Sequence, residues 1–197
     1  MPYGAQMVAP GVRVIAGAAR GRRLVVPRGE LVRPTKDRVK AAIFSALDSR
    51  GLLVDAVVLD LFAGSGALGI ESLSRGAAAA TVVERHGAAL EAITANRGVL
   101  DEPDRLRIHA GDVAAFLTST RSTFDVVFCD PPYEMTNAAV GEVLAAATTV
   151  APGGIVVLER PTRPQRDDST EMPHPSDWRE SWRRSFGDTL VTFWTPS

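Results

Sequence analysis

Four apolar runs, each with an acidic side chain at or near its end, constrain the fold of this chain most strongly. The first run, residues 57–62, carries Asp60, and the later runs end at Glu84, Asp112 and Asp130. Short apolar runs separated by helical segments predict βαβ units and a parallel sheet. The carboxyl ends of parallel strands lie at one edge, where ligands bind in such folds. We therefore predict an α/β, Rossmann-like domain with acidic groups gathered at one edge.

A glycine-rich loop, residues 63–69, joins the first run to a predicted helix that ends near Arg75. Glycines let the backbone approach a ligand, and a helix N-terminus offers unpaired N–H groups. Gly64, Gly66 and Gly69 also match the GxGxxG pattern of dinucleotide-binding proteins, which is weak on its own. The residues of this loop region expected to contact a cofactor are Phe62, Ala63, Gly64, Ser65 and Gly66.

The acidic groups favour S-adenosylmethionine over a nicotinamide cofactor. Asp60 precedes the glycine loop, where a carboxylate would repel a pyrophosphate but can accept from the amino group of a methionine moiety. Glu84 lies 24 residues further on and is placed to accept from both ribose hydroxyls. Asp112 is expected at the adenine amino group, with Val113 against the ring and Arg85 as a further cofactor contact. The sequence shows no tyrosine–lysine pair or histidine relay for hydride transfer.

The fourth apolar run ends in the tetrad Asp130-Pro131-Pro132-Tyr133. Two prolines stop the strand and restrict the side chains and carbonyls around them. The Asp130 carboxylate and the Pro131 carbonyl can accept the two hydrogens of an amino group, while Tyr133 stacks on the ring that carries it. The tetrad thus predicts methylation of an exocyclic amine, with Asp130 and Pro131 catalytic and Pro132 and Tyr133 at the substrate. On these four residues alone, a proline turn with a surface tyrosine is an equal alternative.

Basic residues are concentrated in the first part of the chain. Residues 1–40 hold nine basic and two acidic side chains, a charge of +7, which leaves -8 on the remainder because the whole chain carries -1. Cationic side chains bind nucleic acid at its phosphates. Residues 13–27 predict two short strands joined by a small-residue turn, for which a solvated charged face is the alternative to an RNA contact. The expected RNA contacts are Arg13, Arg20, Arg22, Arg23 and Arg33.

A helix is predicted from Thr35 to near Gly51. Pro34 disfavours a helical conformation at Arg33, which makes Thr35 the expected N-cap. Thr35 and Arg38 lie in the first turn, where they are expected to meet an anionic part of the cofactor. Capping by Thr35 and a surface ion pair of Arg38 are the simpler explanations.

The second half of the chain continues the same pattern. We predict a helix over 140–149 and a fifth strand over 155–158 that ends at Glu159. Residues 161–177 contain four prolines and many polar side chains, which predicts a mobile connection. Residues 182–194 predict an antiparallel edge hairpin around a Gly-Asp turn.

Composition narrows the class of protein. The chain has no apolar run near 18 residues and no recognisable leader, so a soluble, intracellular and cytoplasmic protein is expected. Its single cysteine, Cys129, excludes an intrachain disulfide and a cysteine zinc cluster. The three histidines have no ligand spacing, so we expect no metal. The oligomeric state is not encoded in any pattern, and a monomer is the expectation.

Four segments together carry a family resemblance: residues 13–22, 33–39, 60–66 and 130–133. The chain resembles the bacterial small-subunit ribosomal RNA guanine-N2 methyltransferases of the RsmD type. The glycine loop and the tetrad are shared by many amino-methylating enzymes, whereas the amino-terminal arginines and Arg33-Pro34-Thr35 narrow the resemblance to this family.

The resemblance implies a class I methyltransferase domain over residues 33–197, with a seven-stranded sheet, and a small basic β-hairpin extension over residues 1–32. It further implies S-adenosylmethionine as methyl donor and one guanine of 16S ribosomal RNA as target, within the small ribosomal subunit or its assembly intermediate. Adenine N6 of DNA or RNA is an alternative target that the tetrad permits equally well. An NAD-dependent oxidoreductase, or a non-catalytic nucleotide-binding module, is the alternative from another class.

Overall fold

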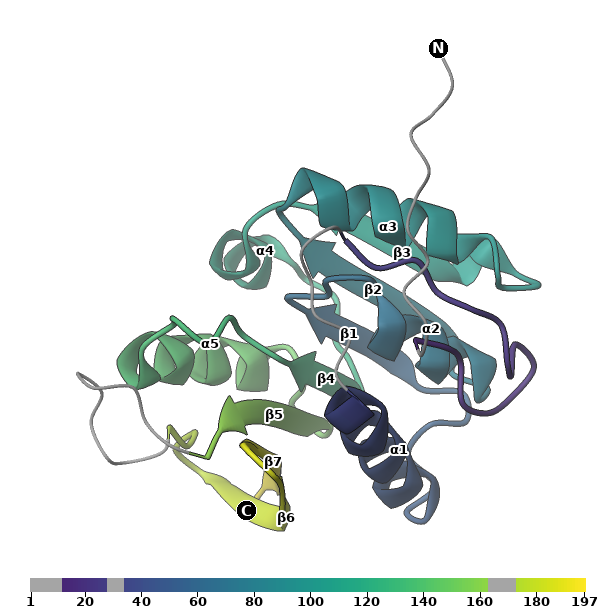
Figure 1. Cartoon of the computed structure of the whole chain (residues 1–197). Coiled ribbons are helices and arrows are strands. Elements are labelled where there is room, and N and C mark those ends of the chain that lie inside the picture. The colour runs from purple at the N-terminus through teal and green to yellow at the C-terminus, as the bar shows by residue number, and fades with distance from the viewer. Residues whose placement is uncertain (1–11, 28–33, 163–172) are drawn as a thin grey trace.

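The computed structural model describes residues 12–27, 34–162 and 173–197, with the side chains of the second range described from Asp37 onward. Within these residues, one seven-stranded sheet is flanked by five α-helices (Figure 1). The strands are β1 (Val57–Leu61), β2 (Ala79–Glu84), β3 (Leu106–Ala110), β4 (Val126–Cys129), β5 (Ile155–Pro161), β6 (Trp178–Phe186) and β7 (Thr189–Pro196). The helices are α1 (Pro34–Asp48), α2 (Ala67–Ser74), α3 (Gly87–Arg97), α4 (Val113–Ser119) and α5 (Asn137–Thr149), with a 3₁₀ turn η1 (Pro103–Arg105).

The strand order is β3-β2-β1-β4-β5-β7-β6. Strands β1 to β5 pair in parallel, whereas β7 is antiparallel to both β5 and β6. Cys129 of β4 pairs with Leu61 on one side and Leu158 on the other, so the last residues of β1 and β4 are level with Leu158 of β5, which continues to Pro161. The strand order reverses between β1 and β4, which is where α/β sheets open a ligand crevice. The predicted mostly parallel sheet with a carboxyl-terminal antiparallel hairpin is confirmed.

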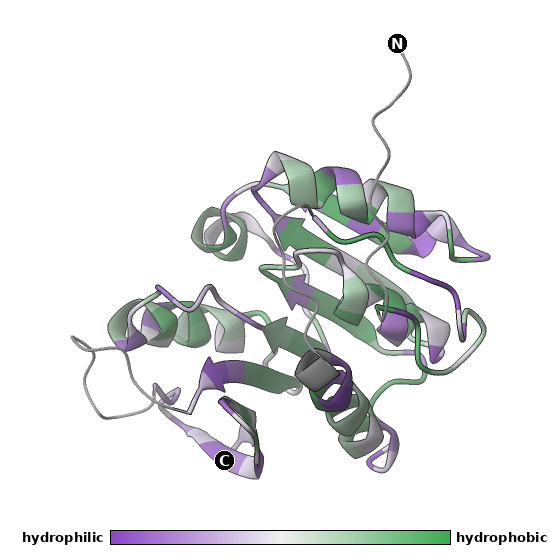
Figure 2. Cartoon of the chain, in the orientation of Figure 1, coloured by the Kyte–Doolittle hydropathy of each residue, from purple (hydrophilic) through white to green (hydrophobic). Residues whose placement is uncertain are grey.

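Helices cover both faces of the sheet, and the apolar residues of the strands fill two cores. One core contains Val58 and Val126 together with the inner faces of α1, α2 and α3. The other contains Leu59 and Val127 together with α4 and α5. Figure 2 shows the central strands as mostly hydrophobic and the edge strand β6 as mostly hydrophilic. Because the central strands are apolar on both faces, their acidic side chains are concentrated at their carboxyl ends.

The arginine segment, residues 12–27, does not form the two predicted strands. A single antiparallel bridge joins Arg13 to Arg23, and the N–H groups of Val14 and Leu24 donate to the carbonyls of Arg22 and Val12, so the two arms pair as the prediction expects but without forming regular strands. The reason is that the turn binds α2 instead: Ile15 and Ala16 donate their N–H groups to Glu71, at 2.8 and 3.0 Å. The apolar side chains of the segment are buried in the main core, and these are Val14, Ala19 and Leu24. The arginine segment is therefore a short antiparallel turn, without regular strands, that is packed on the domain.

Helix α1 begins at Pro34, one residue before the predicted start. Proline is suited to the first position of a helix, where its missing N–H is not needed. The prediction of Thr35 as N-cap is therefore wrong, since Thr35 lies inside the first turn. The predicted connection over 161–177 falls largely on residues 163–172, which lie outside the described residues. Within the described ranges, none of the helices has the length and apolar character needed to cross a lipid bilayer.

Candidate active site

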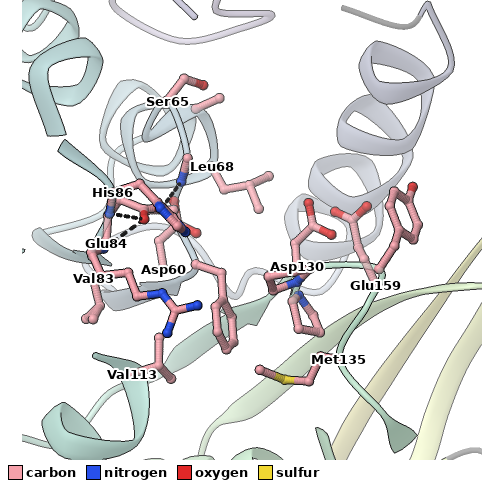
Figure 3. A pocket seen from close by; sticks show the side chains of 18 of the residues that line it. Asp60, Ser65, Leu68, Val83, Glu84, His86, Val113, Asp130, Met135 and Glu159 are labelled. Atoms are coloured by element: carbon pink, nitrogen blue, oxygen red, sulfur yellow. Dashed lines mark hydrogen bonds between the residues drawn. The ribbon is translucent and has the colours of Figure 1, made fainter. Parts of the chain in front are cut away.

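A cavity of about 580 Å³ opens along the carboxyl edge of the parallel strands. Figure 3 shows that its walls come from the strand ends: Asp60, Glu84 and Val113 lie on one side, and Asp130, Met135 and Glu159 on the other. The predicted site residues that line it are Asp60, Phe62, Ala63, Gly64, Ser65, Glu84, Arg85, Asp112, Val113, Asp130, Pro131, Pro132 and Tyr133. The fold thus brings the glycine loop and the tetrad into one cavity.

Asp60 lies buried near the end of β1, with 1% of its surface exposed. The N–H of Gly69, in the first turn of α2, donates to its Oδ2 at 3.0 Å. Burial raises the pKa of Asp60 to about 8, the Gly69 hydrogen bond opposes this, and the charges of Asp130 and Glu84 add to it. Asp60 is therefore mostly protonated at pH 7 and becomes an anion readily when a cation approaches.

The loop between β1 and α2 has an unusual backbone. Phe62, Gly64 and Gly66 all have positive φ angles, of 58°, 54° and 74°. A non-glycine residue such as Phe62 in this region costs on the order of 1–3 kcal/mol and persists only where the surroundings hold it. The third glycine of the pattern, Gly69, has a packing role, because a Cβ there would lie 2.8 Å from Cγ1 of Val82. Gly66 is buried and is not part of the cavity lining.

Glu84 ends β2 and holds the glycine loop against it. Its carboxylate accepts from the N–H groups of Gly64, Arg85 and His86, at 2.9, 2.7 and 2.9 Å. An ionised carboxylate has about four acceptor positions, so acceptor capacity remains for a ligand hydroxyl. Glu84 therefore shapes the cavity and also lines it.

Asp112 follows β3 and is the N-cap of α4. Its Oδ1 accepts from Ala114 and Ala115 N–H at 2.9 and 3.2 Å, and its Oδ2 lies 3.6 Å from a guanidinium nitrogen of Arg85. The next residue, Val113, is buried and lines the cavity. The ion pair between Arg85 and Asp112 links the residues that follow β2 and β3 on this side of the cavity.

The tetrad continues β4 into a loop that other residues hold in place. Pro131 is buried, and the side chain of Tyr133 is 40% exposed at the rim. The guanidinium of Arg160, on β5, donates to the Met135 carbonyl at 2.9 Å and to Oδ1 of Asn137 at 3.1 Å. Arg160 is a functional candidate that sequence reasoning missed, because nothing in the sequence shows which loop a buried arginine contacts.

Sequence reasoning also missed Glu159 as a site residue, and it lines the cavity from the second half of β5. The signal was present, because it is a fifth acidic residue near a strand end. From α1, Asp37 and Lys40 reach the cavity, whereas Arg38 is exposed and is not part of its lining. Arg33 and the side chain of Thr35 lie outside the described residues.

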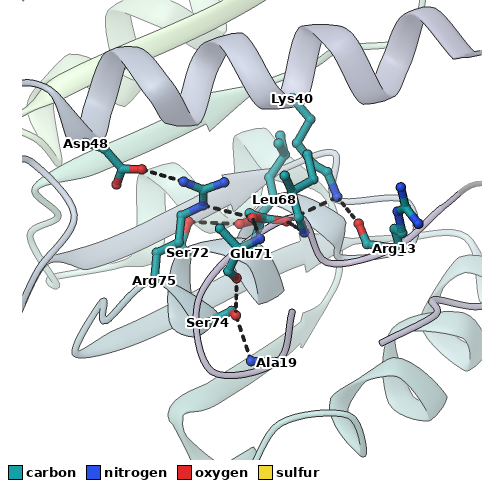
Figure 4. A network of polar contacts seen from close by, with 11 residues as sticks. Arg13, Ala19, Lys40, Asp48, Leu68, Glu71, Ser72, Ser74 and Arg75 are labelled. Carbon is teal, nitrogen blue, oxygen red and sulfur yellow. Dashed lines mark hydrogen bonds and ion pairs between the residues drawn. The ribbon is translucent and has the colours of Figure 1, made fainter. Parts of the chain in front are cut away.

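A buried ionic network joins α1, α2 and the arginine segment (Figure 4). Glu71 is fully buried and binds Lys40 Nζ at 3.3 Å and Arg75 Nε at 2.8 Å. Arg75 also pairs with Asp48, and Lys40 Nζ donates to the Arg13 carbonyl at 2.7 Å. Burial lowers the pKa of Lys40, and the neighbouring Glu71 charge opposes that shift. The network fixes the arginine segment beside the cavity.

The arginine segment borders the cavity without placing its arginines inside. Val12 and Val26, near the two ends of the segment, line the cavity. Asn96 of α3 holds the carboxyl-terminal end of the segment. Its side chain accepts from the N–H of Val25 at 2.6 Å and donates to the Val25 carbonyl at 2.8 Å and the Ser65 carbonyl at 2.9 Å. The four arginines of the described segment are exposed, and these are Arg13, Arg20, Arg22 and Arg23.

No group of three or more histidine, cysteine, aspartate or glutamate side chains in the described part of the chain is arranged to hold a metal ion.

Comparison with known proteins identifies the family. The profile of the family described as conserved hypothetical protein 95 matches residues 12–195. The chain belongs to this family. Ribosomal RNA small subunit methyltransferase D of Escherichia coli K12 is 41% identical over 122 residues, which span 62% of this chain and 60% of that relative's length. The enzyme with the same name from Haemophilus influenzae is 33% identical over 175 residues, or 87% of this chain and 84% of that relative. The resemblance to the RsmD-type family is thereby confirmed.

Solved structures share the fold of this family member. The yhhF protein of Escherichia coli, assigned as a methyltransferase, has a TM-score of 0.78 at 30% identity, covering 94% of this chain and 98% of that one. A hypothetical protein of Thermus thermophilus has a TM-score of 0.73 at 33% identity, covering 92% and 98%. Magnesium protoporphyrin IX methyltransferase of Synechocystis with bound SAH reaches 0.65 at 13% identity, covering 83% and 84%, which shows the fold alone. The predicted class I methyltransferase fold is confirmed.

Proposed function

We propose that this protein uses S-adenosylmethionine to methylate the exocyclic N2 amine of a guanine in 16S ribosomal RNA. The observation that carries the proposal is that the tetrad and the glycine loop share one cavity, with acidic strand ends between and around them. The similarity to the ribosomal RNA small subunit methyltransferases D of Escherichia coli and Haemophilus influenzae supports ribosomal RNA as the substrate class.

The chemistry of the cavity residues fits the cofactor. Asp60 is a buried carboxyl group, and a nearby cation favours its ionised form. The ionised carboxylate can then pair with the cationic amino group of the cofactor. Glu84 has acceptor capacity left for a ribose hydroxyl, while Asp112 and Val113 offer an acceptor and an apolar surface to adenine. When bound, S-adenosylmethionine supplies a methyl group on a sulfonium sulfur, which keeps the bonding electron pair as the methyl carbon bonds to the amine nitrogen.

Asp130 and the Pro131 carbonyl prepare the amine for this transfer. The nitrogen lone pair of guanine N2 is delocalised into the ring, so the site must favour a more tetrahedral nitrogen. Two acceptors that hold the two amine hydrogens favour this tetrahedral geometry, and their hydrogen bonds strengthen as positive charge develops on the nitrogen. The nitrogen then loses one proton, for which Asp130 is the acceptor. Arg160 contributes by fixing the loop after the tetrad, since a small displacement of reacting groups is costly.

The arginine segment provides the RNA-binding surface in this proposal. Its exposed arginines lie on a loop that is tied to α1, α2 and α3 and that lines the cavity at both ends. RNA phosphates held there would bring a target base to the rim, where Tyr133 is exposed for stacking. We place residues 1–32 as the RNA-docking extension of a methyltransferase domain over 33–197, which acts on the small ribosomal subunit or its assembly intermediate.

Nucleoside analysis tests the proposal. The protein is incubated with methyl-labelled S-adenosylmethionine and either unmodified 16S RNA or small subunits reconstituted from it, and the RNA is digested to nucleosides and separated by liquid chromatography. We expect the label in N2-methylguanosine, at one position that mass spectrometry of ribonuclease fragments then maps. Label in N6-methyladenosine, or no label with either substrate, would contradict the guanine assignment.

A further inference from the structure

Glu159 lies beside Asp130 at the same level of the sheet. Cys129 of β4 pairs with Leu158 of β5 in parallel register, so Asp130 and Glu159 are the next residues along two neighbouring strands. Both side chains line the cavity, and Figure 3 shows their carboxyl groups next to each other, away from the Glu84 wall. A base bound with its amine at Asp130 would therefore face two carboxyl groups.

A second carboxylate next to the amine distinguishes the nucleobases. In guanine, the ring atom N1 beside the N2 amine carries a hydrogen, so this edge presents donors side by side. In adenine and cytosine, the ring nitrogen beside the exocyclic amine is an acceptor with a lone pair. A carboxylate accepts hydrogen bonds and repels a lone pair. Two adjacent carboxylates thus match guanine and oppose the other two amino-bearing bases.

We propose that Glu159 determines base specificity by accepting a hydrogen bond from guanine N1–H while Asp130 and the Pro131 carbonyl hold the N2 hydrogens. This inference rests on the proposed methyltransferase function and adds the group that selects guanine. The tetrad alone accepts any exocyclic amine, whereas Glu159 supplies both the attractive contact with guanine and the repulsive one with adenine. Glu159 is fixed in this position by its strand, since Arg160, the next residue of β5, is buried and bonded to the loop after the tetrad.

A four-way comparison tests this role against a structural one. The two substrates are 16S RNAs built by splinted ligation, with guanine or 2-aminopurine at the mapped position and presented as reconstituted small subunits. Because 2-aminopurine keeps the 2-amino group but has an unprotonated N1, it removes the proposed contact. The two proteins are wild type and Glu159→Gln, whose amide can donate to a bare N1. 2-Aminopurine also lacks O6, but this loss affects both proteins equally. Dividing the guanine preference of wild type by that of Glu159→Gln therefore isolates the contribution of the N1 hydrogen.

Wild type is expected to prefer guanine by about 100-fold or more in kcat/KM, as sites that hydrogen-bond a substrate N–H do. In Glu159→Gln this preference should fall by about 10-fold or more, while S-adenosylhomocysteine affinity stays within about 2-fold. 2-Aminopurine fluorescence gives a second readout, because the variant should bind the 2-aminopurine RNA more tightly than wild type does. Glu142→Gln, on α5 and outside the cavity lining, is the matched control and should leave the preference unchanged.

Equal rates of wild type on both substrates would overturn the inference, and this comparison holds even if Glu159→Gln fails to fold. The inference would also be overturned if Glu159→Gln lowered both rates by the same factor, since that indicates a purely structural role. A wild-type protein that methylates no guanine would instead refute the proposed function itself.

Discussion

Asp60 is expected to release a proton when the cofactor binds. Its carboxyl is buried near the end of β1, and desolvation raises its pKa to about 8 in the free protein. Below that pH the side chain is mostly neutral. A cationic amino group placed beside it stabilises the ionised form. Below pH 8, Asp60 must therefore lose its proton when a cofactor with a cationic amino group binds, such as S-adenosylhomocysteine. The affinity for this cofactor should rise with pH.

The size of the effect follows from the fraction of ionised Asp60. With a pKa of about 8, this fraction is about 0.5 at pH 8, about 0.1 at pH 7 and about 0.01 at pH 6. The apparent dissociation constant scales with the inverse of the competent fraction, so it should be about 50-fold larger at pH 6 than at pH 8. At pH 7, binding should release about 0.9 protons.

Isothermal titration calorimetry measures both quantities. S-adenosylhomocysteine is titrated at pH 6, 7 and 8 in buffers of different ionisation enthalpy, which reveals the protons released. Because His86 also lines the cavity, two controls establish that the released proton comes from Asp60. Asp60→Asn should remove the pH dependence, and 5′-methylthioadenosine, which lacks the amino-acid part, should show none in the wild-type protein. A pH-independent affinity for S-adenosylhomocysteine, or an equal slope for both ligands, would refute the reasoning.

Three further predictions concern stability, reactivity and RNA binding. Glu71→Ala should lower the free energy of unfolding by about 3–5 kcal/mol, because it leaves Lys40 without its buried partner; Asp101→Ala, at an exposed pair with Arg22, should cost about 1 kcal/mol or less in the same urea titration. Burial raises the pKa of the Cys129 thiol, so a thiol reagent should label it only after denaturation, and rapid labelling of the native protein would contradict the buried position. Alanine at the three turn arginines should weaken RNA binding and reduce the slope of log K against log salt by up to about 2–3, whereas an unchanged slope would exclude the segment from the interface. These three are Arg20, Arg22 and Arg23.

The sheet and most of its acidic edge could be predicted because they depend on local patterns. Apolar runs identify the central strands, since both of their faces are buried, and the glycine pattern identifies the turn after β1. Parallel strands then bring their carboxyl ends together, so residues as distant as Asp60 and Asp130 were predicted at one edge and do line one cavity.

Features that depend on distant partners could not be predicted. The arms of the arginine segment pair as a hairpin would, but N–H groups of its turn bind Glu71 and Ser74 of α2, and these contacts are invisible in a local pattern. Helix α4 spans only seven residues, too few for a clear periodicity, and it was not predicted. Lys40 is one of the nine basic residues counted in positions 1–40 as a candidate nucleic-acid-binding region, whereas the structure buries it against Glu71 and at the cavity.

The central claim is that Asp130 holds an exocyclic amine for methylation, and one experiment on Asp130→Ala tests it most directly. Methyl transfer to 16S RNA is followed by nucleoside chromatography, and S-adenosylhomocysteine binding to the same preparation is measured by calorimetry. The account predicts that N2-methylguanosine disappears while the dissociation constant of S-adenosylhomocysteine changes by less than about 3-fold, because Asp130 contributes to the transition state rather than to cofactor binding. Full turnover by Asp130→Ala would contradict it.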